Sequence, residues 1–337
     1  MADVVSWFMT DVSADAQGRH RFSIRDHRGP NERIFSDRNG EEYVRVGVQD
    51  GDGIVQRKSE VIQDGRSWFD KTVREIYRMK TTRGEYGIEI ELEGQNILGD
   101  CRGWSSHNDN SLRNGGVEYV LNNPGSRQKI RKLVTDLRGM LVQPGRELTP
   151  NYRQSTHVHV NIQEWTLQNV LNFITVFTIF DPLLCHLVGP ERDGNLFCLP
   201  SHDTGDLPYS INMLTRLAKA GRIGSYNFRG KYASLNMNRM VDFGSLEVRV
   251  FPQTLDPDVI DGWLQWIENI QAFSLSKDDK ELRMKIEEAW SNPIGKAIEI
   301  FGIKNISPDE TTRKLITVGA ENAYELYHGI VSGKAGK

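Results

Sequence analysis

Apolar and polar positions alternate with a period of two in several short segments, which is the pattern of a strand with one buried face. The clearest examples are residues 86–94, 156–162 and 244–251. In the first segment, isoleucine and leucine share one face, and Glu89, Glu91 and Glu93 share the other. We therefore expect strands whose apolar faces are covered by helices.

Other segments repeat apolar residues every three or four positions, which predicts helices with one buried stripe. The predicted helices span residues 67–80, 126–141, 166–180, 208–221 and 256–275, and a charged helical tail follows from 278. Ser126 and Asp256 occupy N-cap positions, and Pro257 follows in the first turn of its helix. The segment 166–180 is apolar nearly all round, so we expect it to be the central buried helix.

The order of these elements predicts the fold class. Strands and helices mix without a regular βαβ repeat, and residues 232–239 predict a strand that a polar turn joins to 244–251. This order favours an α+β fold with a largely antiparallel sheet. Residues 1–65 are rich in Gly, Asp, Arg and Ser, with short β-like pieces. We expect a small β-rich N-terminal appendage there, followed by a main domain over 66–337 that ends in the helical tail.

The composition is that of a globular protein, because 38% of the 337 residues are apolar and 26% are charged. The net charge of -3 gives no bulk electrostatic signal for nucleic acid or for an anionic membrane surface. The longest apolar stretch, 170–188, is interrupted by Asn172, Asp181, Pro182 and His186. We therefore expect a buried helix there and no membrane span.

Cysteine usage indicates a reducing compartment. Cys101, Cys185 and Cys198 are odd in number and form no CxxC pair, which argues against a disulfide framework and a zinc ribbon. The first residues lack the basic and apolar regions of a secretory signal. We expect a cytoplasmic protein, located in the host cytoplasm if a phage encodes it.

The polar faces of the predicted strands carry candidate metal ligands. His157 and His159 share one face of their strand, as do Glu247 and Arg249. A row of carboxylates is costly to bury unless a cation compensates the charge. Carboxylate oxygens with occasional imidazole nitrogens suit Mg²⁺ or Mn²⁺, and the lack of cysteine ligands disfavours structural zinc. Such strands can line half of a metal-binding funnel, although a solvated polar face explains each strand taken alone.

Two further acidic residues follow the first strand. Asp109 stands in a polar turn, and Glu118 stands in a short predicted strand over 116–121. Each has a structural explanation of equal weight, as a turn-forming aspartate and as an exposed strand glutamate. Their spacing alone leaves their roles open.

The ordered set of these motifs resembles the amidoligases, or COOH-NH2 ligases, of phages and bacteria, which are related to glutamine synthetase and glutamate-cysteine ligase. The matching motifs are GIEIELE, W(x)4DNSL, GVEYVL, THVHVNI, RDGNLFCLP, KYASLNM and GSLEVRVF(x)2T(x)8W, which span about residues 84–270. Each motif is weak alone, and the ordered set is more specific. The resemblance implies a funnel of antiparallel strands of glutamine synthetase-like type, backed by helices.

The resemblance also implies an ATP-dependent ligase that forms an amide bond through an acyl phosphate. ATP and two or more Mg²⁺ or Mn²⁺ ions would be its cofactors. Its partners would be a carboxylate and an amine, each a small molecule or a peptide. The identity of the acid and of the amine stays open, and a homo-oligomer is compatible with the family.

Site residues follow from the resemblance by position. The metal ligands would be Glu89, Glu91, Asp109, Glu118, His157 and Glu247. His159 would contact an ATP phosphate or a metal-bound water, and Arg249 would stabilise the transferred phosphoryl group. The candidates for binding ATP or substrate are Arg192, Arg229, Lys231 and Asn236.

Two other functions stay open. A cupin-like metal oxygenase or isomerase would use His157, His159 and Glu164, but Asn151 and Leu171 replace the glycines that bracket the cupin motif. A non-catalytic binding protein that keeps the fold would carry the same motifs without turnover. Thermal stabilisation separates the three functions, because a ligase responds to Mg-ATP, an oxygenase responds to ferrous iron, and a binding protein responds to neither.

Overall fold

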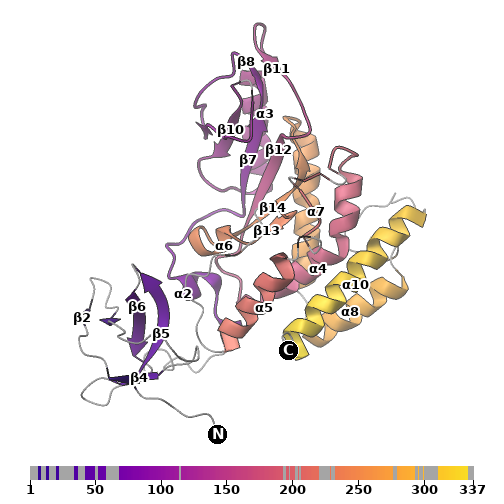
Figure 1. Cartoon of the computed structure of the whole chain (residues 1–337). Coiled ribbons are helices and arrows are strands. Elements are labelled where there is room, and N and C mark those ends of the chain that lie inside the picture. Colours follow the sequence, from indigo (N-terminus) through magenta and orange to yellow (C-terminus); the bar gives the residue numbers. More distant parts are fainter. Residues whose placement is uncertain are drawn as a thin grey trace.

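Figure 1 shows the computed structural model of the chain. It describes residues 7–8, 13–14, 20–22, 34–36, 42–49, 52–57, 68–113, 115–192, 195–196, 198–201, 204, 206–219, 228, 232–275, 279–292, 295, 299 and 310–332. Within these residues, helices and antiparallel strands mix along the chain. The predicted α+β class is therefore confirmed.

The main sheet contains six strands, all paired antiparallel. The strands are β7 (Tyr86–Leu92), β9 (Trp104–His107), β10 (Val117–Leu121), β12 (Ser155–Asn161), β13 (Leu235–Asn236) and β14 (Ser245–Pro252). Their order is β13-β14-β12-β7-β10-β9, so the predicted glutamate, histidine and arginine strands are direct neighbours. The short strands β8 (Gly94–Gln95) and β11 (Glu147–Leu148) pair separately.

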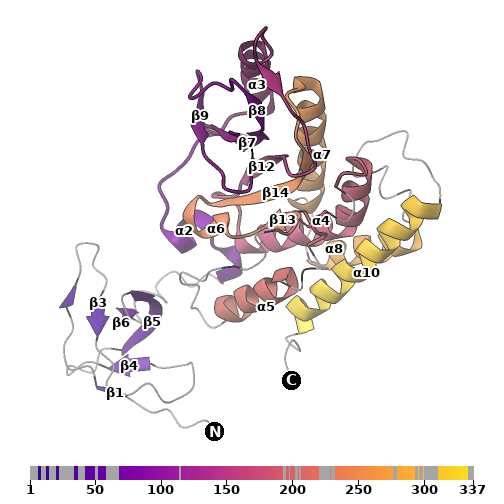
Figure 2. The same cartoon turned by 45° about the horizontal axis from the view of Figure 1, so that its top comes forward.

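Helices cover one face of the main sheet, as Figure 2 shows. They are α3 (Arg127–Leu141), α4 (Leu167–Leu187) and α7 (Pro257–Leu275), and they pack on one another and on the apolar strand residues. Behind α4 lie α8 (Asp279–Ser291) and α10 (Glu310–Ser332), and α5 (Asp206–Lys219) contacts α10. Ile88, Ile90 and Leu92 are buried in this core, so the glutamates between them face away from the helices.

The predicted N-caps are confirmed. Ser126 accepts a hydrogen bond from the amide of Lys129, and the side chain of Asp256 accepts one from the amide of Asp258 at 2.9 Å. Each bond satisfies one of the amide groups that the first helical turn leaves without a partner.

The longest apolar helix, α4, lies in the core. By length and composition alone it is able to cross a membrane, but 83% of its most hydrophobic window is buried inside the protein. Three of its polar side chains form hydrogen bonds inside the protein. The hydroxyls of Thr175 and Thr178 each donate to a carbonyl of the preceding turn at 2.8 Å, and Asp181 accepts the amide of Ser201 at 2.6 Å. The predicted central helix is therefore confirmed.

Three local predictions need correction. The helix predicted over 67–80 is a short turn, η1 (Trp68–Asp70), followed by α2 (Val73–Tyr77), and the left-handed backbone of Arg78 ends it. The central helix does not stop at 180 but continues through Pro182. The polar turn predicted before 244–251 contains a helix, α6 (Arg239–Asp242).

The N-terminal strands form a sheet of their own. They are β1 (Trp7–Phe8), β2 (Ser13–Ala14), β3 (His20–Phe22), β4 (Ile34–Ser36), β5 (Glu42–Gln49) and β6 (Asp52–Arg57), in the order β1-β4-β5-β6-β3-β2. This agrees with the predicted β content before residue 65. The division into an appendage and a main domain stays a prediction.

Candidate active site

The open face of the main sheet gathers the predicted ligands because their strands are neighbours in register. The register partners are Glu91 with Glu118, Glu89 with His157, and Glu247 with His159. Side chains of register partners share a face, with β-carbons about 5 Å apart. A row of acidic and imidazole groups therefore crosses four strands, from β10 to β14.

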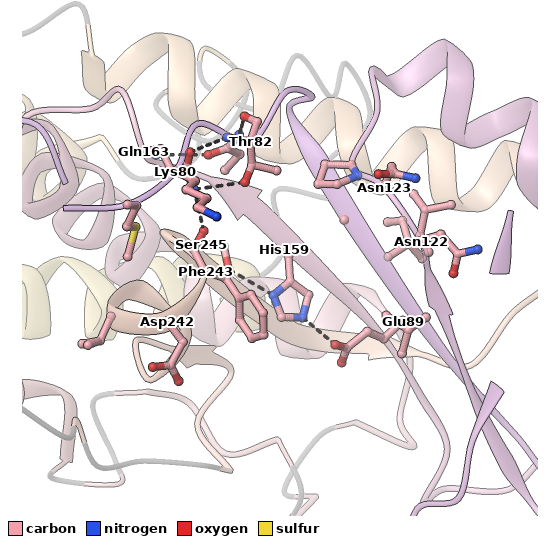
Figure 3. A pocket seen from close by; sticks show the side chains of 18 of the residues that line it. Lys80, Thr82, Glu89, Asn122, Asn123, His159, Gln163, Asp242, Phe243 and Ser245 are labelled. Carbon is pink, nitrogen blue, oxygen red and sulfur yellow. Dashed lines mark hydrogen bonds and ion pairs between the residues drawn. The ribbon is translucent and has the colours of Figure 1, made fainter. Parts of the chain in front are cut away.

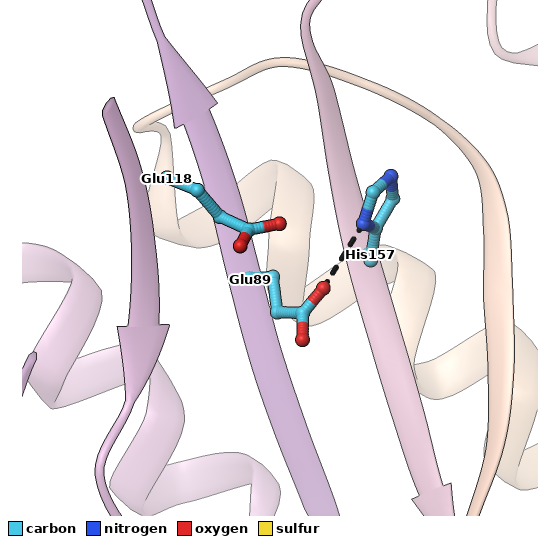
Figure 4. A group of neighbouring side chains, drawn as sticks. All are labelled: Glu89, Glu118 and His157. Atoms are coloured by element: carbon cyan, nitrogen blue, oxygen red, sulfur yellow. Dashed lines mark hydrogen bonds and ion pairs between the residues drawn. The ribbon is translucent and has the colours of Figure 1, made fainter. Parts of the chain in front are cut away.

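Glu89, Glu118 and His157 form the middle of this row. Each offers a ligand atom, and these atoms all lie within 4.8 Å of one another. Figure 4 shows the three side chains reaching from adjacent strands toward the same space. Nδ1 of His157 lies 3.1 Å from a carboxylate oxygen of Glu89, and the ring is buried. The group can hold a cation between two carboxylates and one imidazole.

A second group, Glu89, His159 and Glu247, lies on the β14 side. Nε2 of His159 lies 3.1 Å from Glu89, and Nδ1 lies 3.2 Å from the hydroxyl of Ser245. Glu89 belongs to both groups, so two candidate cation sites share a carboxylate. His159 thus lies among the candidate ligands themselves, and its contact with a phosphate or a bound water stays a prediction.

A third group, Glu91, Asp109 and Glu118, lies on the β10 side. Oδ1 of Asp109 accepts the amide of Ser111 at 2.7 Å, which is the turn-forming contact that an aspartate in a polar loop makes. Asp109 is therefore both a turn residue and a candidate ligand. Since Glu118 is shared with the middle group, the three groups form one continuous row.

Ser155 is a member of the site that the motif analysis missed. Its hydroxyl lies 2.5 Å from Oε2 of Glu91 and 2.7 Å from Nε2 of His157, and its amide donates to the same glutamate oxygen at 2.8 Å. Ser155, like His157 and His159, lies at every second position of β12, so strand alternation alone places it on the same face as the two histidines. It orients one carboxylate and one imidazole at once.

Glu247 is held from two sides. The amide nitrogen of Asn236 donates to Oε2 at 2.7 Å, and Nη1 of Arg249 donates to Oε1. Nε of Arg249 is buried and has no hydrogen-bond partner among the residues that the structure describes. One donor of this guanidinium is therefore left unsatisfied by the residues that the structure describes. Asn236, predicted to bind ATP or substrate, orients a candidate ligand, and its direct contact with ATP stays a prediction.

The charges of the row are unevenly balanced. Burial, together with the nearby carboxylates of Glu89, Glu91 and Asp109, raises the pKa of Glu118 to about 8. Burial opposes ionisation of Glu89 as well, but its hydrogen bonds with His157 and His159 outweigh this and hold its pKa well below the usual value. The carboxyl groups on the β10 side therefore resist ionising together, and a bound cation would favour their charged forms.

A cavity of about 770 Å³ opens beside the β14 side of the row. Glu89, His159 and Ser245 contribute to its lining. Figure 3 shows the other polar and aromatic side chains around it, which include Lys80, Asn122, Asn123, Asp242 and Phe243. Phe243 is 59% exposed although it is a large apolar residue, and the guanidinium of Arg239 lies over its ring at 5.5 Å from the centroid. None of these five residues was predicted, because their segments meet only through the fold.

Gln163 joins two walls of this cavity. Its side chain accepts the amide of Thr82 at 2.8 Å and donates to the carbonyl of Phe243 at 3.0 Å. Gln163 is buried, and Thr82 lies in the segment that leads into β7. The cavity is therefore bounded by segments that hydrogen bonds fix in place.

The remaining predicted residues lie elsewhere. Arg192 is fully buried and donates to backbone carbonyls of β14, so it does not face the cavity, and its predicted contact with ATP or substrate stays untested. Arg229 and Lys231 lie outside the described residues. Glu93 is buried beyond the row, where its carboxylate accepts from the amide of Arg113 and the side chain of Asn151.

The third ligand of the cupin alternative does not reach the histidines. Glu164 forms an ion pair with Arg74 at 2.7 Å, and its side chain is 61% exposed. In its place, Glu89 on the neighbouring strand approaches both histidines. The His-x-His motif therefore belongs to a mixed glutamate and histidine row, which the cupin pattern does not predict.

The comparison with known families agrees with this geometry. Residues 124–271 match a family model described as "Putative amidoligase enzyme". These residues are similar to putative amidoligase enzymes. The predicted resemblance to amidoligases is thereby confirmed over a stretch that contains β12, β13 and β14, with both histidines, Glu247 and Arg249. The glutamates of β7 and β10 precede the matched stretch, and the sheet joins them to the strands of that stretch. A search of curated proteins finds no match.

Proposed function

We propose that the protein is an ATP-dependent carboxylate-amine ligase, which joins an acid and an amine into an amide and releases ADP and phosphate. One observation carries the proposal: three overlapping glutamate, aspartate and histidine groups form a row beside a 770 Å³ cavity. The amidoligase match over 124–271 supports the same reaction class.

Divalent cations fit the donor set. The row offers carboxylate oxygens with one imidazole in two of its three groups and no thiolate, which is the chemistry that Mg²⁺ and Mn²⁺ prefer. We propose that the middle and β10-side groups hold such ions, and that Glu89, His159 and Glu247 hold a further one. When bound, these ions supply positive charge that neutralises phosphate oxygens.

The cavity is our proposed site for ATP. A volume of about 770 Å³ lies within the range of small-molecule sites. The exposed ring of Phe243 offers a stacking surface for a base, and Asn122 and Asn123 offer amide groups for hydrogen bonds. Lys80 supplies positive charge. The triphosphate would then point toward His159 and Glu89, which lie where the cavity meets the row.

The proposed reaction has two steps. An oxygen of the substrate carboxylate attacks the γ-phosphorus, and the bond from that phosphorus to the β-phosphate oxygen breaks, so that ADP leaves. The amine nitrogen then attacks the acyl carbon, the carbon–oxygen bond to phosphate breaks, and the nitrogen loses a proton. We propose that Arg249 donates from its free Nε to the transferred phosphoryl group. Asn236 and Arg249 together keep Glu247 in place.

The test is release of ADP and phosphate across a panel of carboxylic acids and amines with Mg²⁺ or Mn²⁺. Glu247→Gln removes a charged ligand at nearly constant shape, and we expect it to lower kcat by roughly 10² to 10³. Glu164→Gln is the matched control, because the same change there affects only an exposed ion pair. If Glu247→Gln retains turnover, the assignment of this residue is wrong.

Thermal stabilisation provides a readout that does not need the substrates. Mg-ATP should raise the melting temperature of the wild-type protein and of Glu164→Gln, and much less that of Glu247→Gln. Stabilisation by ferrous iron without any response to nucleotide would favour the oxygenase. No response to either would favour a binding protein.

A further inference from the structure

The pairing of strand β14 with β12 is irregular close to Glu247 and Arg249, the two candidate site residues of this strand. Thr156 of β12 pairs with Phe251 of β14, but Val158 pairs with Val248, so the register shifts by one residue between them. His157 therefore stands opposite two residues of β14, Arg249 and Val250, which is a β-bulge. Bulges redirect a side chain and leave backbone groups without a ladder partner.

The buried Arg192 satisfies this bulge. Its Nε donates to the carbonyl of Val250 at 3.1 Å, and its Nη2 donates to the carbonyl of Arg249 at 2.6 Å. Successive carbonyls of a regular strand point to opposite edges, so one guanidinium reaches both only where the backbone is bulged. The planar fork of arginine matches such a pair of acceptors, and lysine has no equivalent.

Arg192 approaches β14 from the exit of α4. Gly189 has a positive φ of +121°, and its carbonyl accepts the amide of Arg192 at 3.1 Å in the turn that follows the helix. The side chain is 1% exposed, and its Nη1 has no hydrogen-bond partner among the described residues. Burying a guanidinium in this way is costly, and hydrophobic residues of similar size often stabilise a fold as well or better. The cost points to a geometric role for Arg192.

The bulge affects the backbone position of Arg249 more than that of Glu247. Glu247 is anchored by its own register pairs, with His159 on one side and Asn236 on the other. The amide of Arg249 donates to the carbonyl of Ser234, and its own carbonyl accepts a hydrogen bond from the side chain of Arg192. Arg192 therefore holds the backbone from which the Arg249 side chain extends to Glu247.

We propose that Arg192 is a positioning residue: by holding the bulge in β14 it directs the guanidinium of Arg249 toward the acidic row. The catalytic part of this inference rests on the proposed ligase function, in which Arg249 contacts the transferred phosphoryl group. The structural part, that Arg192 fixes the bulge, is independent of the reaction.

The test substitutes Arg192→Lys, which keeps the charge and removes the fork. We expect hydrogen exchange of the backbone amides in 245–252 to be faster than in the wild type. We expect kcat for ADP release to fall roughly tenfold to a hundredfold, while KM for ATP and the affinity for Mn²⁺ change by less than about threefold. Arg153→Lys is the control, because it makes the same change in a side chain that contacts Tyr152 and not β14.

A double-mutant cycle separates positioning from general loosening. In an Arg249→Lys background, Arg192→Lys should lower kcat by less than about threefold further, because the residue that it positions is already changed. An equal loss in both backgrounds would refute the proposal, as would unchanged hydrogen exchange in 245–252. Arg192→Gln, which keeps a planar donor without the charge, is the second variant. Loss of folding in both variants would make Arg192 a purely structural residue and refute positioning.

The two proposals fail in different ways. If the wild-type protein releases no ADP with any acid and amine, the proposed function is wrong, and hydrogen exchange still decides whether Arg192 holds the bulge. If the wild type turns over and hydrogen exchange in Arg192→Lys matches that of the wild type, only the positioning role is wrong.

Discussion

Glu118 and Glu91 are register partners across β10 and β7, so two carboxylates lie side by side on the open face of the sheet. Asp109 approaches the same pair from a loop. Like charges at this separation repel strongly when partly buried, and a divalent cation relieves the repulsion. We therefore expect the repulsion between Glu91 and Glu118 to affect the pH dependence of stability, the affinity for metal, and the proposed reaction.

The first prediction concerns pH in metal-free protein. The folded-state pKa of Glu118, about 8, is above the ordinary value of 4.5, so the folded state binds the proton more tightly than the unfolded state between these values. The free energy of unfolding should therefore fall as pH rises from 4.5 to 8, by at most about 1.4 kcal/mol per pH unit from this group. Urea unfolding in the presence of a chelator measures the slope.

Glu118→Gln is the matching variant, because an amide of nearly the same shape does not titrate. The pH slope should become shallower in this variant, and the remaining slope should reflect other groups such as His159, whose pKa is also raised. Saturating Mg²⁺ should remove the part of the slope that Glu118 contributes in the wild type. An unfolding free energy of metal-free wild type that rises between pH 4.5 and 8 would contradict the assigned repulsion.

The second prediction concerns Ser155, which lies between Glu91 and His157. Ser155→Ala leaves both side chains without their shared partner, so we expect the affinity for Mn²⁺ to fall roughly 10-fold to 100-fold. Ser106→Ala serves as control, since the hydroxyl of Ser106 bonds Asp100 outside the row. Calorimetric titration measures both. Equal Mn²⁺ affinities for the two variants would show that Ser155 does not orient the ligands.

The third prediction concerns the exposed ring of Phe243 in the cavity. Phe243→Ala should raise KM for ATP by roughly 5-fold to 100-fold, the range expected from the loss of one stacking contact, and leave kcat nearly unchanged. Phe243→Tyr should keep the low KM. Val142→Ala is a control at a residue of similar exposure, 58% against 59%, that is not part of the cavity lining. A change in kcat without a change in KM would place the nucleotide elsewhere.

Local pattern was sufficient to predict the strands and their faces. Alternation places Ile88 and Ile90 in the core and Glu89 and Glu91 on the open face, and this depends only on the geometry of one strand. The N-caps Ser126 and Asp256 are equally local. For the same reason the predicted row residues lie together on one face, and their role as metal ligands stays a prediction.

Pairing and register could not be predicted from local pattern. Nothing in the segment 86–94 specifies that Glu89 lies opposite His157, because register depends on the whole sheet. The bulge in β14 and the turn that brings Arg192 to it have the same non-local origin, so local pattern carried no sign of the contact between Arg192 and β14. The cavity is built from segments more than a hundred residues apart, such as those of Lys80 and Phe243.

The fourth prediction uses two glycines that sequence alone does not distinguish. Gly319 lies in α10 where it crosses α4, and a methyl group built there overlaps the carbonyl oxygen of Ile179. Gly262 lies in α7, and a methyl group there meets no atom within 4 Å. The same substitution should therefore have opposite effects at the two positions.

Gly319→Ala should lower the free energy of unfolding by about 1–3 kcal/mol, because the two helices must separate to accept the methyl group. Gly262→Ala should raise it by about 0.5–1 kcal/mol, because alanine loses less backbone entropy in a helix than glycine. Urea unfolding of both variants under the same conditions measures the difference. Destabilisation of equal size at both positions would contradict the close approach of α10 to α4, since only Gly319 lies against a neighbouring backbone.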